Sequence, residues 1–305
     1  MKTAAGENMK KVVTVLPTPE PHWVGDGFPV RSLFSYGLQE PDISPFLLLD
    51  HAGPHNFEPG NVNRPRGVGV HPHRGFETVS IAYQGEVSHR DSTGQGGTIG
   101  PGDVQWMTAA GGILHEEFHS QNFTRSGGPF HMVQLWVNLP ASHKMNPPSY
   151  QPILAREIPT VDLSASGGGK LRVIAGAHGD ARGPARTVTP MNVWDLQQRG
   201  GESATLTVPE GHNALVAVLT GRAHIGAAAV PVKQDEVAVL ERAGTALRVS
   251  AATDCMVLIL TGEPLGERVI GYGPFVMNTR EQIMQAIDDF NRGKFGEMPA
   301  GQPAV

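Results

Sequence analysis

Short apolar runs separated by turn residues make up most of the hydrophobic pattern of this chain. Segments such as FPVRSLF, ETVSIAYQGEVSH and HMVQLWVNLP alternate between apolar and polar residues, or are mostly apolar, over the length of a strand. Glycine, proline, asparagine or aspartate bounds most of these segments, which is typical of turns. The pattern therefore predicts an all-β protein built from many short strands.

One segment near the end of the chain has helical rather than strand periodicity. Asn278 or Thr279 can cap a helix, and Gly293 can end it. Between them, apolar residues recur at helical spacing at Ile283, Met284, Ile287 and Phe290. We therefore expect a short C-terminal helix near residues 279–292, packed across the outside of a sheet or between two halves of the protein.

The strand pattern occurs twice along the chain. Residues 77–89 and 213–225 align as strand, turn glycine and strand, with Gly85 over Gly221. The segments PGDVQWM and KQDEVAVL then align through Asp103 and Asp235. A duplicated all-β unit accounts for this repeat.

A segment rich in proline, serine and glycine follows the first copy, after Pro140. It has the composition of a connection between two units, and we place the boundary near residues 146–158. The expected organisation is a flexible N-terminus at residues 1–11, an N-terminal domain at residues 12–150 and a C-terminal domain at residues 151–305.

Composition and charge narrow the classes of function. The net charge of −5, without a dense lysine or arginine tract, argues against binding to nucleic acid or to anionic membranes. The single cysteine, Cys255, lies in an apolar run, so we expect a buried strand residue rather than a nucleophile. The N-terminus lacks the apolar core of a signal peptide, and no apolar run has the length of a membrane span. We therefore expect a soluble, cytoplasmic protein.

Histidines are concentrated in the first half, where ten of the thirteen precede residue 150. Side chains at positions i and i+2 of a strand point to the same face, so His71 with His73 forms one pair and His115 with Glu117 forms another. If the two strands are neighbours, four candidate ligands converge. Three imidazoles and a carboxylate suit Fe, Mn, Ni, Cu, Co or Zn.

A single histidine pair of this kind is also common as ordinary core or surface structure. The second copy offers a comparison, because its aligned positions carry Thr207 and Pro209 in place of His71 and His73. In place of His115 and Glu117 it carries the apolar residues Leu247 and Val249. The fold does not require ligands there, which favours a functional role for the first-half cluster.

Other polar residues nearby have weaker claims to the site. Glu77 shares the parity of His73, so it could bind the metal or orient a ligand histidine. We expect Arg74 to be a surface residue. We also expect the remaining polar residues of these segments to lie at the rim or in solvent: His89, Arg90, Asp91, Glu116 and His119.

The motifs HPHRGFETVSIAYQGEVSHRDS, GPGDVQWMTAAGGILHEEF, QLWVNLP and GEPLGERVIGYGPFVMNTREQI resemble those of the pirin family of the cupin superfamily, over roughly residues 11–295. The resemblance implies two tandem cupin β-barrels of jelly-roll type, the first holding one metal ion, usually iron, and the second having lost its site. It also implies that His71, His73, His115 and Glu117 are the ligands. The general cupin pattern would take its carboxylate from Glu77 instead, but this chain has seven rather than six residues between Glu77 and Gly85, so Glu117 ranks first.

The family resemblance implies two functions of different class. One is an Fe(II)-dependent dioxygenase that opens the ring of flavonols such as quercetin with O₂, with Glu117 accepting the substrate's hydroxyl proton and Glu77 as a rival base. The other is a regulator whose metal oxidation state changes its affinity for a transcription factor or a metabolic enzyme. The sequence carries no partner motif that decides between them.

Overall fold

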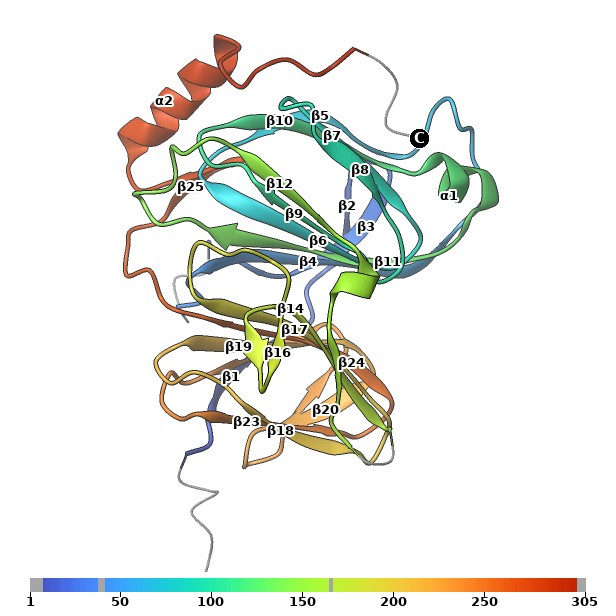
Figure 1. Ribbon diagram of the computed structural model, residues 1–305, viewed down its shortest axis with the longest axis vertical. Coiled ribbons are helices and arrows are strands. Elements are labelled where there is room, and N and C mark those ends of the chain that lie inside the picture. Colours follow the sequence, from blue (N-terminus) through green and yellow to red (C-terminus); the bar gives the residue numbers. More distant parts are fainter. Residues whose placement is uncertain (1–7, 38–41, 165–166, 301–305) are drawn as a thin grey trace, which may run out of the picture. The chain divides into compact units, whose positions relative to one another are not determined.

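The strands pair into two separate sets of sheets in the computed structural model, which describes residues 8–37, 42–164 and 167–300 (Figure 1). The N-terminal barrel, as we call the first set, contains residues 20–37, 46–155 and 266–300. The C-terminal barrel contains residues 8–19 and 42–45 together with the described residues of 156–265. The two barrels, with the helix α2 (Arg280–Asn291) near the C-terminus, form the expected all-β fold.

Two antiparallel sheets form the N-terminal barrel. In spatial order, the larger sheet consists of β12 (Ser149–Ile153), β9 (Val104–Thr108), β6 (Phe76–Gln84), β11 (Gly128–Asn138), β4 (Phe46–Phe57), β3 (Phe28–Ser35) and β2 (His22–Val24). The smaller sheet consists of β5 (Gly67–His73), β10 (Ile113–His119), β7 (Val87–Asp91) and β8 (Gly96–Ile99). One apolar cluster, with Phe28, Phe130 and Val87 among its members, joins the two sheets as in a sandwich.

The C-terminal barrel repeats this strand order. Its larger sheet consists of β1 (Val12–Leu16), β22 (Glu236–Leu240), β19 (Asn213–Thr220), β24 (Cys255–Gly262), β17 (Met191–Gln198), β14 (Gly169–Ala175) and β13 (Thr160–Asp162). Its smaller sheet consists of β18 (Ser203–Thr207), β23 (Ala246–Ala251), β20 (Arg222–Ile225) and β21 (Val230–Lys233). A small hairpin of β15 (Ala177–His178) and β16 (Ala181–Arg182) accompanies them. The repeat predicted from the sequence is therefore present strand for strand.

The aligned glycines of the repeat occupy the same kind of turn. Gly85 and Gly221 have φ angles of +80° and +77°, in the left-handed region that favours glycine. A side chain at Gly85 would also meet the Phe130 ring, and one at Gly221 would meet the carbonyl of Asp254. Both turns lead directly from the larger sheet into the smaller sheet, and each requires glycine because there is no room for a side chain.

The ends of the chain are exchanged between the barrels, unlike the contiguous division expected from the sequence. Strand β1 pairs with β22 and takes the edge position that β12 holds in the other barrel. Residues 8–11, described here out of the expected flexible segment 1–11, are ordered: Lys10 is fully buried, and its Nζ donates to the carbonyls of His212, Glu241 and Arg242. Residues 1–7 lie outside the described part of the chain.

Helix α2 packs on the N-terminal barrel rather than on the barrel that precedes it in the sequence. Thr279 caps it in a capping box with Gln282, and the helix contacts the hairpin of β25 (Ile270–Tyr272) and β26 (Phe275–Met277). Its buried residues are Ile283, Ala286 and Asp289, whereas Met284 and Phe290, which share the predicted helical spacing, are 70% and 39% exposed. A second, unpredicted helix, α1 (Gln121–Ser126), is short, and a single 3-10 turn, η1, spans Ala155–Glu157. Neither α-helix is long and apolar enough to cross a membrane.

Candidate metal centre

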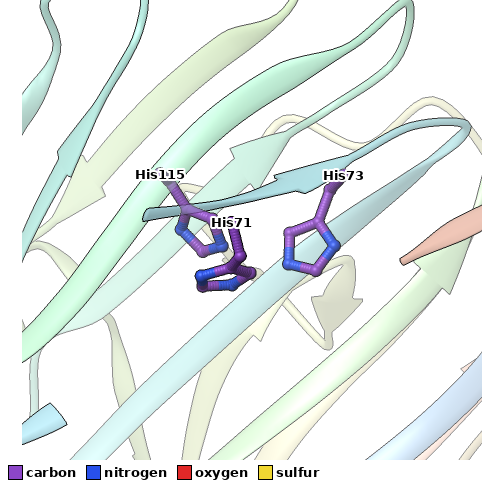
Figure 2. A group of neighbouring side chains, drawn as sticks. All are labelled: His71, His73 and His115. Atoms are coloured by element: carbon purple, nitrogen blue, oxygen red, sulfur yellow. The ribbon is translucent and has the colours of Figure 1, made fainter. Parts of the chain in front are cut away.

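Three of the four predicted ligands converge inside the N-terminal barrel. His71 and His73 lie on β5, and His115 lies on the neighbouring strand β10, directly across from His71 in the antiparallel register. Figure 2 shows the three imidazoles turned toward one another. One ring nitrogen from each lies within 4.8 Å of the others, a spacing from which one ion could be shared.

The hydrogen bonds of His71 and His73 leave one nitrogen of each available to an ion. His71 Nδ1 donates to the carbonyl of Gly69 at 2.8 Å, which leaves Nε2 as the lone-pair nitrogen. His73 bonds to the carbonyl of Pro274, and its buried Nδ1 has no partner among the described residues. The buried Nε2 of His115 is likewise without a partner in the described part of the chain. Buried orphan nitrogens in a cluster are what a metal would satisfy.

Burial also selects the protonation state that binds metals. Desolvation, followed by the charge of His71, lowers the pKa of His73 well below its ordinary value. Desolvation again has the largest effect on His115, and His71, His73 and His89 add to it, so its pKa is also well below the usual range. Neutral imidazole is the form that ligates a metal. These two histidines are therefore in the ligating form at neutral pH.

Glu117 lies beside this cluster with its carboxylate fixed by three side chains. One of its carboxylate oxygens, with one ring nitrogen each from His89 and His115, forms a second group of candidate ligands within 4.8 Å of one another. Ser80 and Gln105 donate to Oε1 at 3.4 Å, and Gln134 donates to Oε2 at 2.9 Å. Ligating carboxylates are commonly hydrogen-bonded in this way. The fourth predicted ligand is thus near the histidines, through His115 rather than through His71 and His73.

Glu77 lies on the other face of strand β6. Ser80 of this strand points into the barrel and donates to Glu117, and Phe76 contacts the His73 ring. Side chains alternate along a strand, so Glu77 points away from that interior and instead accepts a hydrogen bond from Thr108 at 2.7 Å. Its burial raises its pKa to about 7. The geometry therefore gives Glu77 no contact with the cluster, either as a ligand or as a base.

Several residues that the sequence placed at the rim are buried. His89 and Asp91 are almost inaccessible, and their side chains bond to each other. His119 is buried among phenylalanine rings and bonds to the carbonyl of Gly27. Glu116 is buried and pairs with Arg90 on β7. Strands β7 and β10 are neighbours in the smaller sheet, so His89, Asp91 and His119 line its inner face, whereas Glu116 and Arg90 pair on its outer face.

Arg74 is also buried, contrary to the expectation of a surface residue. Its guanidinium pairs with Asp289 of α2 at 2.8 Å and donates to the carbonyl of Gly111 at 2.7 Å. It also lies 4.6 Å from the centre of the Phe295 ring. Arg74 therefore ties the helix to the segment that carries His73.

A cavity of about 310 Å³ opens beside the cluster. His71, His73 and Glu117 form part of its wall, and most of the rest is apolar: Val24, Phe28, Val30, Ala52, Val68, Met132 and Trp136. Asp50 is a further polar group of the wall, and burial raises its pKa despite a hydrogen bond from Ser32. A mostly apolar cavity with a few convergent polar groups is typical of a small-molecule site.

The C-terminal barrel has apolar residues at the corresponding places. His115 pairs with His71 across β10 and β5, and Leu247 pairs with Leu206 across β23 and β18. This register corrects the sequence alignment by one residue, making Leu206 and Val208, not Thr207 and Pro209, the equivalents of His71 and His73. The positions that match His89, Glu117 and the three donors to Glu117 are Ile225, Val249, Val216, Ala238 and Ile259. All of these residues belong to one buried apolar core.

Comparisons with known proteins agree with this architecture. The Pirin family model matches residues 27–137, and the model of the Pirin C-terminal cupin domain matches residues 193–296. A Pseudomonas aeruginosa protein named "Putative quercetin 2,3-dioxygenase" is 57% identical over 94% of this chain and 99% of its own length. A pirin-like protein of Caulobacter vibrioides is 39% identical over 93% of this chain and 98% of its own. The crystal structure of quercetin 2,3-dioxygenase from Acinetobacter baumannii superposes with a TM-score of 0.91 at 55% identity, covering 95% of this chain and 99% of that one.

Proposed function

Since this chain belongs to the pirin family, with its two cupin domains, we propose that it is a metal-dependent dioxygenase that opens the ring of flavonols such as quercetin. The observation that carries the proposal is that His71 and His73 of the three-histidine cluster lie with Glu117 in the wall of a mostly apolar cavity. Its volume of about 310 Å³ falls within the range of about 300–1,000 Å³ usual for small-molecule sites. The named relatives support the substrate class, a small aromatic compound, and O₂ as the second substrate.

We propose that His71, His73, His115 and Glu117 hold one divalent ion, with Fe(II) as the native metal. The histidine nitrogens and the carboxylate oxygen also suit Ni, Mn, Cu, Co or Zn, so the ligand set alone does not select iron. When bound, such an ion supplies Lewis-acid polarisation and a common point of attachment for the two substrates.

The protein's own side chains would orient the flavonol and remove its proton. Phe28, Met132 and Trp136 offer apolar contact to the flat rings and keep water away from them. Glu117, in the wall of the same cavity, would accept the substrate's hydroxyl proton, because its hydrogen bonds hold the carboxylate toward the histidines. Asp50, backed by Ser32, can bond to a second hydroxyl group of the substrate.

Turnover by the iron-loaded protein tests this proposal. The protein is loaded with Fe(II) without oxygen, and quercetin and air are then added. We expect the flavonol absorbance to fall while carbon monoxide is released. His73→Ala should abolish both signals, whereas His224→Ala in the C-terminal barrel should leave them unchanged. Turnover no faster than that of free iron would contradict the enzyme, and metal binding without turnover would favour the regulatory alternative.

A further inference from the structure

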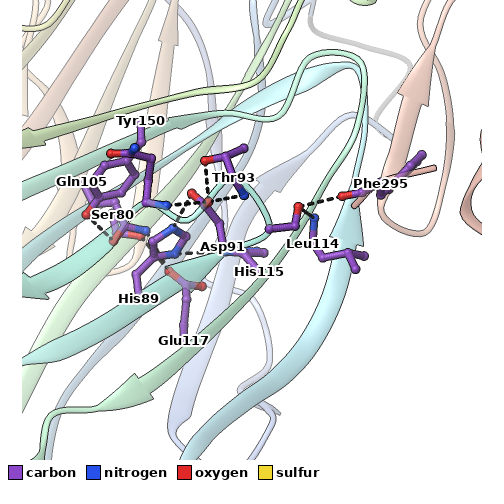
Figure 3. A network of polar contacts seen from close by, with 12 residues as sticks. Ser80, His89, Asp91, Thr93, Gln105, Leu114, His115, Glu117, Tyr150 and Phe295 are labelled. Atoms are coloured by element: carbon purple, nitrogen blue, oxygen red, sulfur yellow. Dashed lines mark hydrogen bonds and ion pairs between the residues drawn. The ribbon is translucent and has the colours of Figure 1, made fainter. Parts of the chain in front are cut away.

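His115 differs from the other two histidines of the cluster in what holds its ring. Backbone carbonyls bond to His71 and His73, whereas Nδ1 of His115 lies 3.3 Å from Nδ1 of His89. On the other side of His89, Nε2 lies 3.3 Å from a carboxylate oxygen of Asp91 (Figure 3). Asp91, His89 and His115 therefore form a chain that ends at the metal cluster.

Asp91, the first member of this hydrogen-bond chain, determines which atoms donate and which accept along it. Oδ1 of Asp91 accepts hydrogen bonds from the backbone N–H of Thr93, the Thr93 hydroxyl and the backbone N–H of Gln95. A carboxylate held by three donors can only accept, so Nε2 of His89 donates to Oδ2. The neutral His89 then has its lone pair on Nδ1 and accepts from Nδ1–H of His115. Nε2 of His115 is left with its lone pair, which is the state that can bind an ion.

We propose that Asp91 and His89 are positioning residues that hold His115 in the tautomer able to bind the metal. The inference rests on the proposed metal site and adds two residues to it. Stacking fixes the plane of the His89 ring, since the Tyr150 ring lies parallel to it with 5.1 Å between centroids. All three members of the chain are buried, so water does not compete for these bonds.

Direct ligation by His89 is the competing assignment, because His89, His115 and Glu117 also have ligand atoms within 4.8 Å of one another. His89 would then have to give up its bond to His115. Nδ1 of His115 would lose its acceptor as a result, and His115 would lose the one contact that fixes its tautomer. The hydrogen-bond relay from Asp91 through His89 to His115 gives the ring nitrogens of both histidines their partners in one arrangement, which is why the geometry favours it.

Asp91→Asn reverses the chain while keeping the turn. The amide oxygen of the asparagine still accepts from Thr93 and Gln95, so the amide nitrogen faces His89 and donates to it. His89 must then donate to His115, which places the proton of His115 on Nε2. We expect nitrogen-detected NMR of the metal-free protein to show His115 protonated at Nδ1 in the wild type and at Nε2 in Asp91→Asn. Co(II), measured by competition with a chelator, should bind the variant about 10- to 100-fold more weakly.

Two further variants complete the test. Thr93→Val removes one donor to Asp91 but leaves the bond to His89, so it should keep the wild-type tautomer and Co(II) affinity. His89→Phe preserves the stack on Tyr150 and removes the acceptor, so His115 should populate both tautomers and bind Co(II) more weakly. Pulsed EPR of the Cu(II)-loaded protein should count three bound imidazoles in both the wild type and His89→Phe.

The outcomes separate this inference from the proposed function. An unchanged His115 tautomer in Asp91→Asn would overturn the relay even if the wild type binds Co(II) tightly. A fourth bound imidazole that disappears in His89→Phe would make His89 a ligand and would also overturn it. A wild-type protein that binds no metal would contradict the proposed function, while the tautomer measurement would still decide the relay.

Discussion

The Glu117 carboxylate is buried inside a barrel whose counterpart in the second half has apolar residues at the corresponding positions. An isolated buried charge costs several kcal/mol, so it needs donors close by. Ser80, Gln105 and Gln134 supply them from three adjacent strands of the larger sheet, β6, β9 and β11. The buried carboxylate therefore depends on all three polar neighbours. A carboxylate placed alone in the other barrel would lack these donors.

Glu117→Gln tests the role of this carboxylate. The substitution keeps the size of the side chain but removes its charge, so the metal should bind more weakly and kcat should fall by about 10²- to 10⁴-fold if Glu117 accepts the proton. Glu116→Gln is the matched control, because Glu116 lies next in the chain and pairs with Arg90 instead. Calorimetric metal titration and flavonol turnover measure the two effects. Equal losses in both variants would assign the effect to the strand rather than to Glu117.

Lys144 is a second buried ionisable side chain, on the segment that precedes β12, and burial lowers its pKa to about 7. Its Nζ donates to the carbonyls of Gly75 and Val276 and to the side chain of Asn138. Lys144→Met fills the same space but leaves three acceptors unbonded, which should lower the free energy of unfolding by roughly 3 kcal/mol. Urea unfolding measures this, with Lys170→Met at an exposed position as the control. A loss below about 1 kcal/mol would show that water reaches these acceptors after the substitution.

Residue spacing predicted His71, His73, His115 and Glu117 because each pair lies within one strand, where side chains alternate. The prediction that Glu77 shares the face of His73 is wrong, because the chain turns at Gly75, with φ of +92°, between the two residues. Parity does not carry across such a turn. His89 and Asp91 also form a same-face pair, but a sequence does not show that β7 lies beside β10. The positioning residues were missed for that reason.

At the scale of elements, α2 shows what local patterns determine. Its capping box is encoded by Thr279 and Gln282, so the start of the helix was predictable. Its inward face was not, because Asp289 is buried by its pairing with Arg74 while the apolar Met284 is exposed. The same holds for strand β1: its apolar pattern predicts a strand but does not indicate which sheet the strand joins.

Asp289→Asn tests whether the buried ion pair holds α2 in place. The substitution leaves Arg74 buried without a counter-charge, and breaking a buried pair in this way costs about 3–5 kcal/mol. Amide hydrogens of α2 should exchange faster, as measured by mass spectrometry. Asp288→Asn is the control, because Asp288 pairs with Arg292 at the exposed surface, where a pair contributes little. Unchanged exchange in Asp289→Asn would mean that the apolar contacts of the helix suffice.

Across the whole molecule, the same strand order contains two different interiors. The C-terminal barrel is filled mostly by aliphatic side chains, whereas the N-terminal barrel combines its apolar cluster with histidines, Glu117 and the amides around it. The duplicated pattern predicted the shared strands because their alternation is the same in both copies. The metal-free N-terminal barrel should depend on pH far more than its counterpart, because buried neutral histidines resist protonation.

The direction of that dependence follows from His119, His73 and His115, whose pKa values in the folded protein are lowered. Burial lowers the pKa of His119 to about 4, against about 6.5 in an unfolded chain. As the pH falls below about 6.5 these histidines gain protons in the unfolded chain but not in the folded barrel, so their contribution to stability falls until the folded pKa is reached. For His119 alone the loss between pH 6.5 and 4 amounts to about 3 kcal/mol.

Hydrogen exchange of the metal-free protein, followed peptide by peptide between pH 7 and 4 and corrected for intrinsic exchange rates, should show the N-terminal barrel opening at a higher pH than the C-terminal barrel. His119→Gln can keep the bond to the Gly27 carbonyl but cannot titrate, so it should reduce the slope of stability against pH by about one proton in this window. A wild-type slope in that variant would assign the acid sensitivity to the cluster histidines. If the two barrels open at the same pH, the buried histidines of the N-terminal barrel are not the cause of its acid sensitivity.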